Sequence, residues 1–297
     1  MSVELTTPVT IHWDLPSPAA ETPMLLRTCE GILACKPLVL QLRDPGPGLG
    51  AGTAALIARL ADARLAVHLT VAPDAFAAAA ALLPHPALRE LLLLVARPEE
   101  LPAAFPPPPS GDRHGETSFG VSYRVTPDNW RLLPDLVSLC RERGIARIVL
   151  PMQRLYAGEP PFLLGREEQR VLSEALVAAG GTEGCQLTIH DPFLWRAFNP
   201  GIPFPQGGCQ AANTMLAVAP DGAAYPCPTL PVSLGDAGKT PLRDIALSRE
   251  KRELRQRLLH SPEGCAGCGE LAWCRGGCRG RSYLLHGSLG EIDPACR

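Results

Sequence analysis

Short runs rich in valine, isoleucine and leucine alternate with amphipathic stretches through the first two-thirds of the chain. Each apolar run has the length and composition of a strand buried in a parallel sheet. The stretches between them carry their apolar residues at helical spacing. This pattern predicts strands at 9–15, 38–43, 65–71, 88–95, 118–125, 146–152 and 185–190, and helices at 22–34, 53–63, 74–83, 127–143 and 166–179.

The clearest of these helices covers residues 127–143, where Leu136, Val137 and Cys140 belong to an apolar stripe. Pro134 lies inside the stretch, and proline removes a helical hydrogen bond and clashes with the preceding turn. The sequence therefore predicts that the helix kinks or restarts near Pro134.

Strand–helix alternation of this kind predicts an α/β fold with parallel strands and right-handed crossovers. Six such units would form a partial (β/α)6 barrel, smaller than the eightfold barrel. The pattern changes near residue 201, after which turn residues dominate and a single helix is predicted over 241–260. We therefore expect two domains, a barrel at 1–200 and a small Cys-rich domain at 201–297.

Composition excludes several classes of partner. Of the 297 residues, 46% are hydrophobic and 20% are charged, and the net charge is −2. This balance offers no basic surface for nucleic acid and no polybasic patch for an anionic membrane. No apolar run approaches the ~20 residues of a transmembrane helix, and the N-terminus has no signal-peptide pattern. We therefore expect a cytoplasmic protein that binds neither nucleic acid nor membrane.

Cysteine is the informative residue. The chain has 11 cysteines, seven of them in the last 89 residues. In a cytosolic chain of this size such crowding predicts metal ligation rather than disulfides. Residues 261–297 are rich in glycine and cysteine and have almost no apolar periodicity. Hydrophobic burial alone would not offset the entropy of ordering this segment, so we expect bound metal to hold it together.

The cysteine spacing and the wording of two segments resemble a known family. GGCQAANTMLAVAPDGAAYPC and CAGCGELAWCRGGCRG are similar to the SPASM domain, the C-terminal twin-cluster module of many radical S-adenosylmethionine (SAM) enzymes that modify peptides. The resemblance covers about residues 201–297. In the N-terminal part, VSYRVTPDNWRLLPDLVSLCRERGIARIVL resembles the radical-SAM-like partial barrel that precedes this module.

The resemblance implies two [4Fe–4S] clusters held by cysteine thiolates. It divides the seven C-terminal cysteines into an outer set of four and an inner set of three. The outer set is Cys265, Cys268, Cys274 and Cys296, and the inner set is Cys209, Cys227 and Cys278.

Two clusters need eight ligands, so the inner cluster lacks one. The family often supplies it shortly before the position of Cys209, but GIPFPQG contains no cysteine. The inner cluster would then have an open site, a water or a ligand from elsewhere. Cys185, His190 and Asp191 are candidates, and the alternative for each is a core residue at a strand end.

Three arginines lie among the proposed ligands. Arg275, Arg279 and Arg281 would offset the negative charge of the clusters and raise their reduction potential. The alternative is that they form a solvated surface face.

The ligands for SAM are missing from the barrel. A radical SAM enzyme carries a C-x3-C-x2-C motif after its first strand, but this region contains only Cys29 and Cys35. The second strand ends in DPGPG instead of a GGEP-like motif. The resemblance therefore implies a degenerate barrel that binds no SAM and has no catalytic residues of that kind. We interpret Cys29 and Cys35 as buried thiols on the first helix, with metal ligation or a redox pair as the alternative.

This organisation resembles the SPASM-domain accessory protein of the GeoRSP peptide-modification system. The resemblance implies an iron–sulfur accessory protein that acts with a radical SAM/SPASM partner enzyme on a peptide substrate, by binding the substrate or relaying electrons. Two other functions remain open. One is an independent enzyme whose open inner-cluster iron binds substrate as a Lewis acid. The other is a zinc-stabilised interaction module, because paired cysteines also bind zinc.

Overall fold

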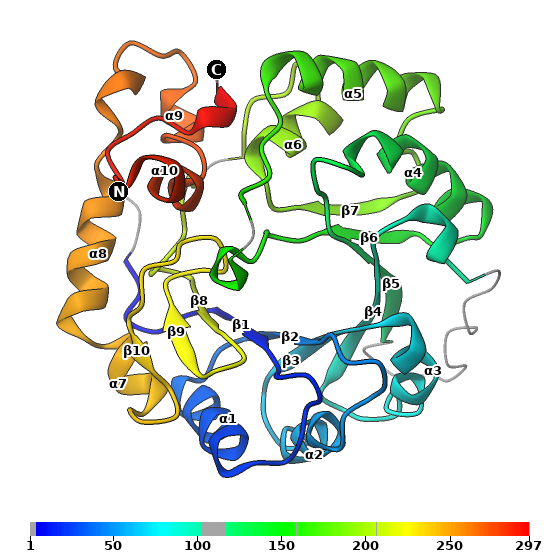
Figure 1. The fold of residues 1–297 in the computed structure, drawn as a ribbon, viewed down its shortest axis with the longest axis vertical. Coiled ribbons are helices and arrows are strands. Elements are labelled where there is room, and N and C mark those ends of the chain that lie inside the picture. The colour runs from blue at the N-terminus through cyan, green and yellow to red at the C-terminus, as the bar shows by residue number, and fades with distance from the viewer. Residues whose placement is uncertain (1–3, 103–116, 159, 206, 297) are drawn as a thin grey trace.

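The computed structural model describes residues 4–102, 117–158, 160–205 and 207–296. A curved ten-stranded sheet in the order β10-β9-β8-β1-β2-β3-β4-β5-β6-β7 surrounds the centre of the molecule (Figure 1). Neighbouring strands from β1 to β7 pair in parallel. The strands are β1 Thr10–Asp14, β2 Val39–Asp44, β3 Ala66–Val71, β4 Leu88–Val95, β5 Ser118–Tyr123, β6 Arg147–Leu150, β7 Gln186–Ile189, β8 Met215–Val218, β9 Ala223–Tyr225 and β10 Gly235–Asp236.

The helices that connect the parallel strands lie on the outer side of the sheet, and the last helices gather beside its C-terminal strands (Figure 1). The helices are α1 Pro23–Cys35, α2 Ala51–Arg59, α3 Pro73–Ala80, α4 Leu133–Glu142, α5 Arg166–Ala178, α6 Pro192–Phe198, α7 Leu242–Ala246, α8 Arg249–Leu259, α9 Leu271–Cys274 and α10 Arg279–His286. Short 3₁₀ turns cover Pro98–Glu100, Trp130–Leu132, Leu155–Ala157, Glu263–Cys265 and Pro294–Cys296.

The main hydrophobic core lies between the sheet and the outer helices. Helix α1 illustrates how the sequence builds it: Thr22 caps its first turn, with Oγ1 accepting from Leu25 N at 3.2 Å, and Leu25 and Ile32 are buried. Branched residues of the strands, such as Ile11 and Leu40, fill the opposite side of this core. The α/β fold with a mostly parallel sheet, predicted from the alternating pattern, is thereby confirmed.

Two helix predictions have different outcomes. Helix α4 begins at Leu133 with Pro134 in its first turn, so the predicted restart at Pro134 is confirmed. The single helix predicted over 241–260 is wrong, because α7 ends at Ala246 and α8 begins at Arg249. The break has a local cause: the Ser248 side chain caps α8 by accepting from the backbone N–H of Lys251 at 3.1 Å.

The sheet continues from the N-terminal strands into the C-terminal part of the chain. Strand β8 pairs in parallel with β1, with Thr10 opposite Met215, and β9 and β10 follow as antiparallel strands. The expected domain boundary between residues 200 and 201 is therefore crossed by one continuous sheet. This continuity brings the segments around Cys209 and Cys227, which flank β8 and β9, next to the barrel strands.

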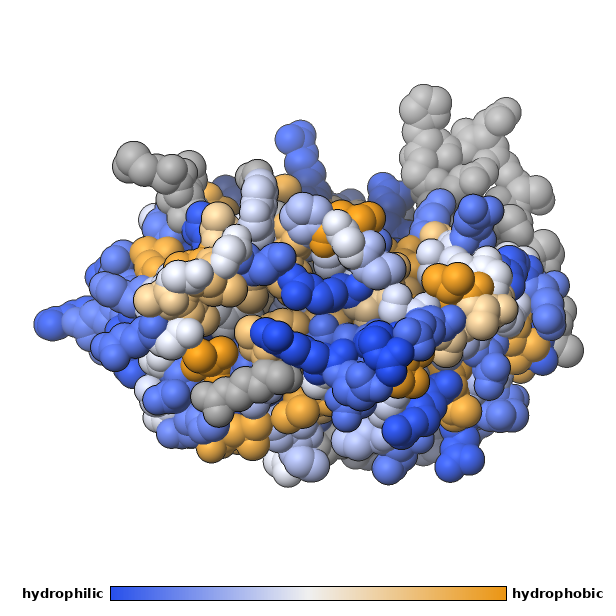
Figure 2. Space-filling model, turned by 90° about the horizontal axis from the view of Figure 1, so that it is seen from above, coloured by the Kyte–Doolittle hydropathy of each residue, from blue (hydrophilic) through white to orange (hydrophobic). Residues whose placement is uncertain are grey.

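The face of the molecule in Figure 2 intersperses apolar residues with charged ones. Within the described ranges, none of the helices has both the length and the hydropathy that crossing a bilayer requires.

Candidate metal centres

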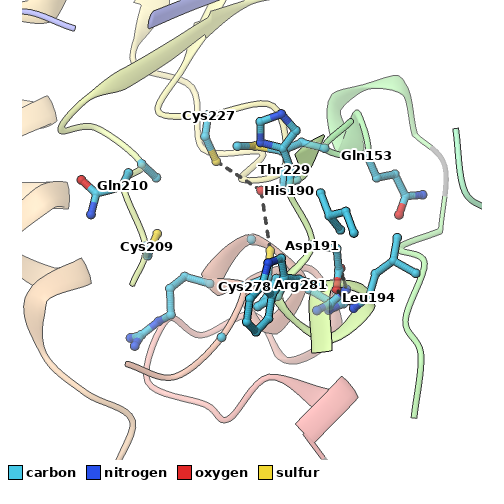
Figure 3. A pocket seen from close by; sticks show the side chains of 18 of the residues that line it. Gln153, His190, Asp191, Leu194, Cys209, Gln210, Cys227, Thr229, Cys278 and Arg281 are labelled. Carbon is cyan, nitrogen blue, oxygen red and sulfur yellow. Dashed lines mark hydrogen bonds and ion pairs between the residues drawn. The ribbon is translucent and has the colours of Figure 1, made fainter. Parts of the chain in front are cut away.

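The inner set of cysteines lines one cavity of about 330 Å³. Cys209 precedes β8, Cys227 follows β9, and Cys278 is the residue before α10. The thiols of Cys227 and Cys278 lie 3.2 Å and 3.7 Å from the hydroxyl of Thr229, which sits between them (Figure 3). Three cysteines from separate segments of the chain therefore meet around one cavity.

The inner thiols lie in surroundings that disfavour the free thiolate. Burial raises the pKa of Cys209 and of Cys278, and it raises the pKa of Cys227 to about 12, with a further contribution from neighbouring Cys209. A neutral, buried thiol must lose its proton before it binds metal, because the thiolate is the form that binds. We therefore expect metal binding here to release protons.

The outer set lines a second, smaller cavity of about 70 Å³. Cys265 ends one 3₁₀ turn, Cys274 ends α9, and Cys296 ends the last 3₁₀ turn, while Cys268 lies between the first two. Burial raises the pKa of Cys265, and the nearby thiols of Cys296 and Cys268 raise it further. The four cysteines are therefore neighbours around one space.

The two cavities adjoin, because Cys274 and Phe204 line both of them. Among the described residues, no three Cys, His, Asp or Glu side chains are close enough together to hold a single metal ion. A tetrahedral zinc site would need its sulfur atoms within ~3.8 Å of one another, given a Zn–S distance of about 2.3 Å. An iron–sulfur cluster contains several irons, so its thiolates lie further apart than those of a zinc site.

Arg279 provides an independent test of this fit. Its side chain is buried, Nη1 donates to the carbonyl of His260 at 3.1 Å, and Nη2 donates to the carbonyl of Leu289. Its Nε is buried without a hydrogen-bond partner in the part of the chain that the structure describes. Burial lowers the pKa of Arg279, whereas Cys209 and Cys265 raise it, so the guanidinium lies near both cysteine sets. An unpaired buried donor indicates a missing acceptor, and the sulfur atoms of a cluster would be acceptors.

The arginines that the sequence singled out have different environments. Arg275 is exposed, so the solvated-face interpretation describes it correctly. Arg279 and Arg281 are buried, so that interpretation is wrong for them. Arg281 pairs with the carboxylates of Asp293, at 2.8 Å, and Asp191, so two protein groups already balance its charge.

The three candidates for the eighth ligand differ in their position relative to the inner cavity. His190 and Asp191 line the inner cavity, whereas Cys185 is not among the described residues that line it. Asp191 Oδ1 caps α6 by accepting from the backbone N–H groups of Phe193 and Leu194 at 2.9 and 3.0 Å. Ligation by His190 or Asp191 remains a prediction that the structure does not test.

Cys29 and Cys35 lie on the buried face of α1, within the main core. Burial raises the pKa of each to about 11. These placements agree with the interpretation of both residues as buried thiols.

Sequence reasoning missed two residues of the site, Thr229 and Asp293. Thr229 stands two positions after Cys227 and contacts two thiols of the inner set. Asp293 stands three positions before Cys296 and accepts from the backbone N–H of Cys278 at 2.6 Å. A polar residue within three positions of a proposed ligand was the available signal, because residues around a metal site commonly orient its ligands.

A known family matches part of the C-terminal region. Residues 209–269 match the SPASM family, an iron–sulfur cluster-binding domain. These residues thus carry the sequence pattern of a module that binds iron–sulfur clusters.

Solved structures share the whole fold. Streptococcus suis SuiB bound to S-adenosylmethionine aligns with a TM-score of 0.67 and 15% identity, over 99% of this chain and 78% of SuiB. SuiB bound to the precursor peptide SuiA gives a TM-score of 0.65 at 15% identity, over 99% and 77% of the two chains. The protein anSMEcpe with bound AdoMet and the Cp18Cys peptide gives 0.62 at 15% identity, over 97% and 94%. At this identity the likeness establishes the fold and no more.

Proposed function

We propose that this chain is an iron–sulfur accessory protein that holds two [4Fe–4S] clusters and acts with a radical SAM/SPASM enzyme on a peptide substrate, as in a GeoRSP-type system. The observation that carries the proposal is the division of the seven C-terminal cysteines around two adjoining cavities. Bound clusters would supply electron storage and transfer. The outer set would be Cys265, Cys268, Cys274 and Cys296, and the inner set Cys209, Cys227 and Cys278.

The proposed absence of SAM cleavage is supported by the residues at the C-terminal ends of the barrel strands. Asp14 ends β1, Arg43 lies near the end of β2, and Arg154 follows β6, and both guanidinium groups contact the Asp14 carboxylate. Cys29 and Cys35, the two cysteines between β1 and β2, are buried on α1 in the main core. SAM carries a sulfonium and an ammonium against one carboxylate, so a site dominated by guanidinium groups disfavours it.

The larger cavity supports a substrate-binding role. Leu194, Trp195 and Phe204 give it apolar walls. Gln153 and Gln210 contribute amide groups (Figure 3). Apolar walls with a few placed polar groups are typical of a ligand pocket, and a peptide offers both apolar side chains and backbone amides. A peptide held in this cavity would lie beside the inner thiols.

The adjoining cavities support electron relay as the second part of the role. Cys274 lines both spaces, and the buried guanidinium of Arg279 lies near one thiol of each set. A positive charge in that position would stabilise the reduced form of either cluster and so raise its reduction potential.

A second candidate function is an independent enzyme that uses an open iron of the inner cluster. It is favoured by one observation: the fourth cysteine that lines the 330 Å³ cavity, Cys274, also lines the smaller cavity and is assigned to the outer set, which leaves three cysteines for the inner cluster. Such an iron would bind substrate as a Lewis acid. This candidate requires turnover without a partner, which the accessory role excludes.

The proposal is tested by anaerobic reconstitution of the full chain with iron and sulfide. We expect about eight irons and eight sulfides per chain, and no 5′-deoxyadenosine when SAM and a strong reductant are added. Production of 5′-deoxyadenosine would contradict the accessory role, and a colourless protein that binds only zinc would contradict the clusters. Turnover of a peptide by this chain alone would favour the second candidate.

A further inference from the structure

The barrel interior contains charged side chains in two layers. In the layer near the N-terminal ends of the strands, Glu90 pairs with Arg147 at 2.6 Å and lies 3.3 Å from His68. Gln41 also contacts this group, with its Nε2 3.0 Å from His68 Nδ1. One carboxylate therefore faces one guanidinium in this layer, and the pair is balanced.

In the layer near the C-terminal ends of the strands, positive and negative charges do not balance. Asp14 is buried, and its two oxygens lie 3.2 Å from Arg154 Nη2 and 3.6 Å from Arg43 Nη1. The hydroxyl of Tyr156 donates to Asp14 at 2.5 Å and adds no charge. Among the described residues, these two guanidinium groups thus share the Asp14 carboxylate, which leaves an excess of positive charge in this layer.

Both arginines also retain an unused donor. Arg43 Nε and Arg154 Nη1 are buried, and neither has a hydrogen-bond partner among the described residues. The side chain of Arg154 is only 11% exposed, so solvent does not readily satisfy it. Guanidinium donors presented as a fork match the two oxygens of a carboxylate.

These arginines line a cavity of about 40 Å³, which we call the arginine cavity. Arg124, Ser122 and Thr70 contribute further polar groups to its wall. The rings of His12 and His190 also line it, and burial followed by the charge of Arg154 lowers the pKa of both. Neutral rings leave the arginines as the source of positive charge, and the volume suits a single small acidic group.

The arginine cavity lies next to the larger cavity that contains the inner thiols. Pro151, Met152 and His190 line both spaces. A molecule bound in the larger cavity can therefore extend one group toward the arginines.

We propose that the arginine cavity binds a carboxylate of the peptide substrate, supplied by an acidic side chain or by the C-terminus. The unused N–H groups of Arg43 and Arg154 would each donate a hydrogen bond to one carboxylate oxygen. This inference rests on the proposed peptide substrate for its biological meaning. Binding of a carboxylate to the arginines is nevertheless independent of the clusters.

The first test compares small probes on the reconstituted full chain by titration calorimetry. N-acetylglutamate N-methylamide presents a side-chain carboxylate, N-acetylglycine presents a terminal carboxylate, and N-acetylglutamine N-methylamide is the matched neutral control. We expect at least one acid to bind about tenfold or more tightly than the neutral control. The stronger of the two acids identifies the source of the carboxylate. Equal binding of acids and amide, or tighter binding of inorganic phosphate than of either acid, overturns the proposal.

Two variants provide a second test, because they should change the affinity for the acid in opposite directions. Arg154→Gln should weaken binding of the better acid by about tenfold or more, because it removes a charged donor. Asp14→Asn should tighten it, because the competing carboxylate is gone. Arg170→Gln, on the exposed face of α5, is the matched control and should change nothing. If Asp14→Asn binds the acid no more tightly than the wild type, the arginines are not the receptor.

Iron is measured in the same samples, with folding checked by circular dichroism. A chain with the expected iron that binds neither acid overturns this inference and leaves the proposed function intact. A chain that binds an acid but takes up no iron overturns the proposed function alone.

Discussion

Arg281 and Asp293 form a two-point ion pair inside the C-terminal region, with Nε to Oδ1 and Nη2 to Oδ2 both at 2.8 Å. The Asp293 carboxylate also accepts from the backbone N–H groups of Cys278, at 2.6 Å, and Ala295, at 3.1 Å. Ala295 precedes Cys296. One carboxylate therefore positions the backbone at a cysteine of the inner set and beside a cysteine of the outer set.

Gly277 makes this arrangement possible. Its φ is +70°, and a Cβ atom there would lie 2.6 Å from the Cβ of Asp293. Glycine tolerates both the left-handed backbone and the close approach.

The first prediction concerns the Arg281–Asp293 pair. Asp293→Asn removes one of the two carboxylates that face Arg281 and weakens the acceptor of the Cys278 and Ala295 backbone N–H groups. Asp191 still pairs with the guanidinium, so we expect a loss of about 1–3 kcal/mol in the free energy of unfolding, together with lower iron content. The measurements are thermal unfolding and iron per chain. Glu174→Gln, which breaks an exposed pair with Arg170, is the control and should alter neither quantity. Equal behaviour of the two variants would show that the Asp293 carboxylate positions nothing.

The second prediction separates the two cysteine sets. Cys265→Ala removes an outer ligand while leaving the inner cavity intact, so we expect the iron content to fall by about four atoms per chain. Cys227→Ala should remove the other four. Cys140→Ala is the control, because this buried thiol lies in the main core. Loss of all iron in either ligand variant would instead indicate one shared centre.

The parallel strands could be predicted from the sequence because each is short and carries apolar residues that pack in or against the main core. The predicted strand at 88–95 matches β4, Leu88–Val95, at both ends. The strands β8 to β10 could not be found in this way. They have four, three and two residues, and their place in the sheet depends on pairing with β1, which is distant in sequence.

The resemblance to the SPASM domain implied the grouping of the cysteines, but it gave no sign of their polar surroundings. Charged residues are almost never fully buried unless paired, so Arg281 in a glycine-rich segment gave no sign of its burial. Its partner Asp191 lies 90 residues away in the sequence and Asp293 lies 12 residues away. The arginine cavity had a weaker signal, since Asp14 and Arg43 stand at strand ends, where barrel proteins place functional residues.

The third prediction concerns the Thr229 hydroxyl. It lies 3.2 Å from the Cys227 sulfur and 3.7 Å from the Cys278 sulfur, so it can donate to a thiolate in the inner set. Hydrogen bonds to ligand sulfurs favour the reduced cluster. Thr229→Val keeps the shape and removes the donor, so we expect a lower reduction potential of the inner cluster with unchanged iron content. Potentiometric titration followed by electron paramagnetic resonance measures it. Thr53→Val, whose hydroxyl donates to Asp44 at 2.5 Å, is the control and should leave the potential unchanged.

The fourth prediction concerns acid stability and the buried histidines of the barrel. Burial, then the charge of Arg154, lowers the pKa of His12 well below 6.5 and the pKa of His190 to about 4. Below pH 6.5 the unfolded chain takes up protons that the folded chain refuses, so stability falls as the pH falls from 6.5 toward the folded-state values. For His190 alone the interval of about 2.5 pH units corresponds to about 3 kcal/mol.

The histidine prediction is checked by measuring Tm between pH 7.5 and pH 5. His12→Asn removes one proton-linked group, so its Tm should decline less steeply with falling pH than that of the wild type. His286→Asn, at an exposed position at the end of α10, should keep the wild-type slope. A wild-type slope in His12→Asn would mean that this ring can be protonated inside the folded barrel, and the excess positive charge assigned to the arginines would then be too weak to prevent it.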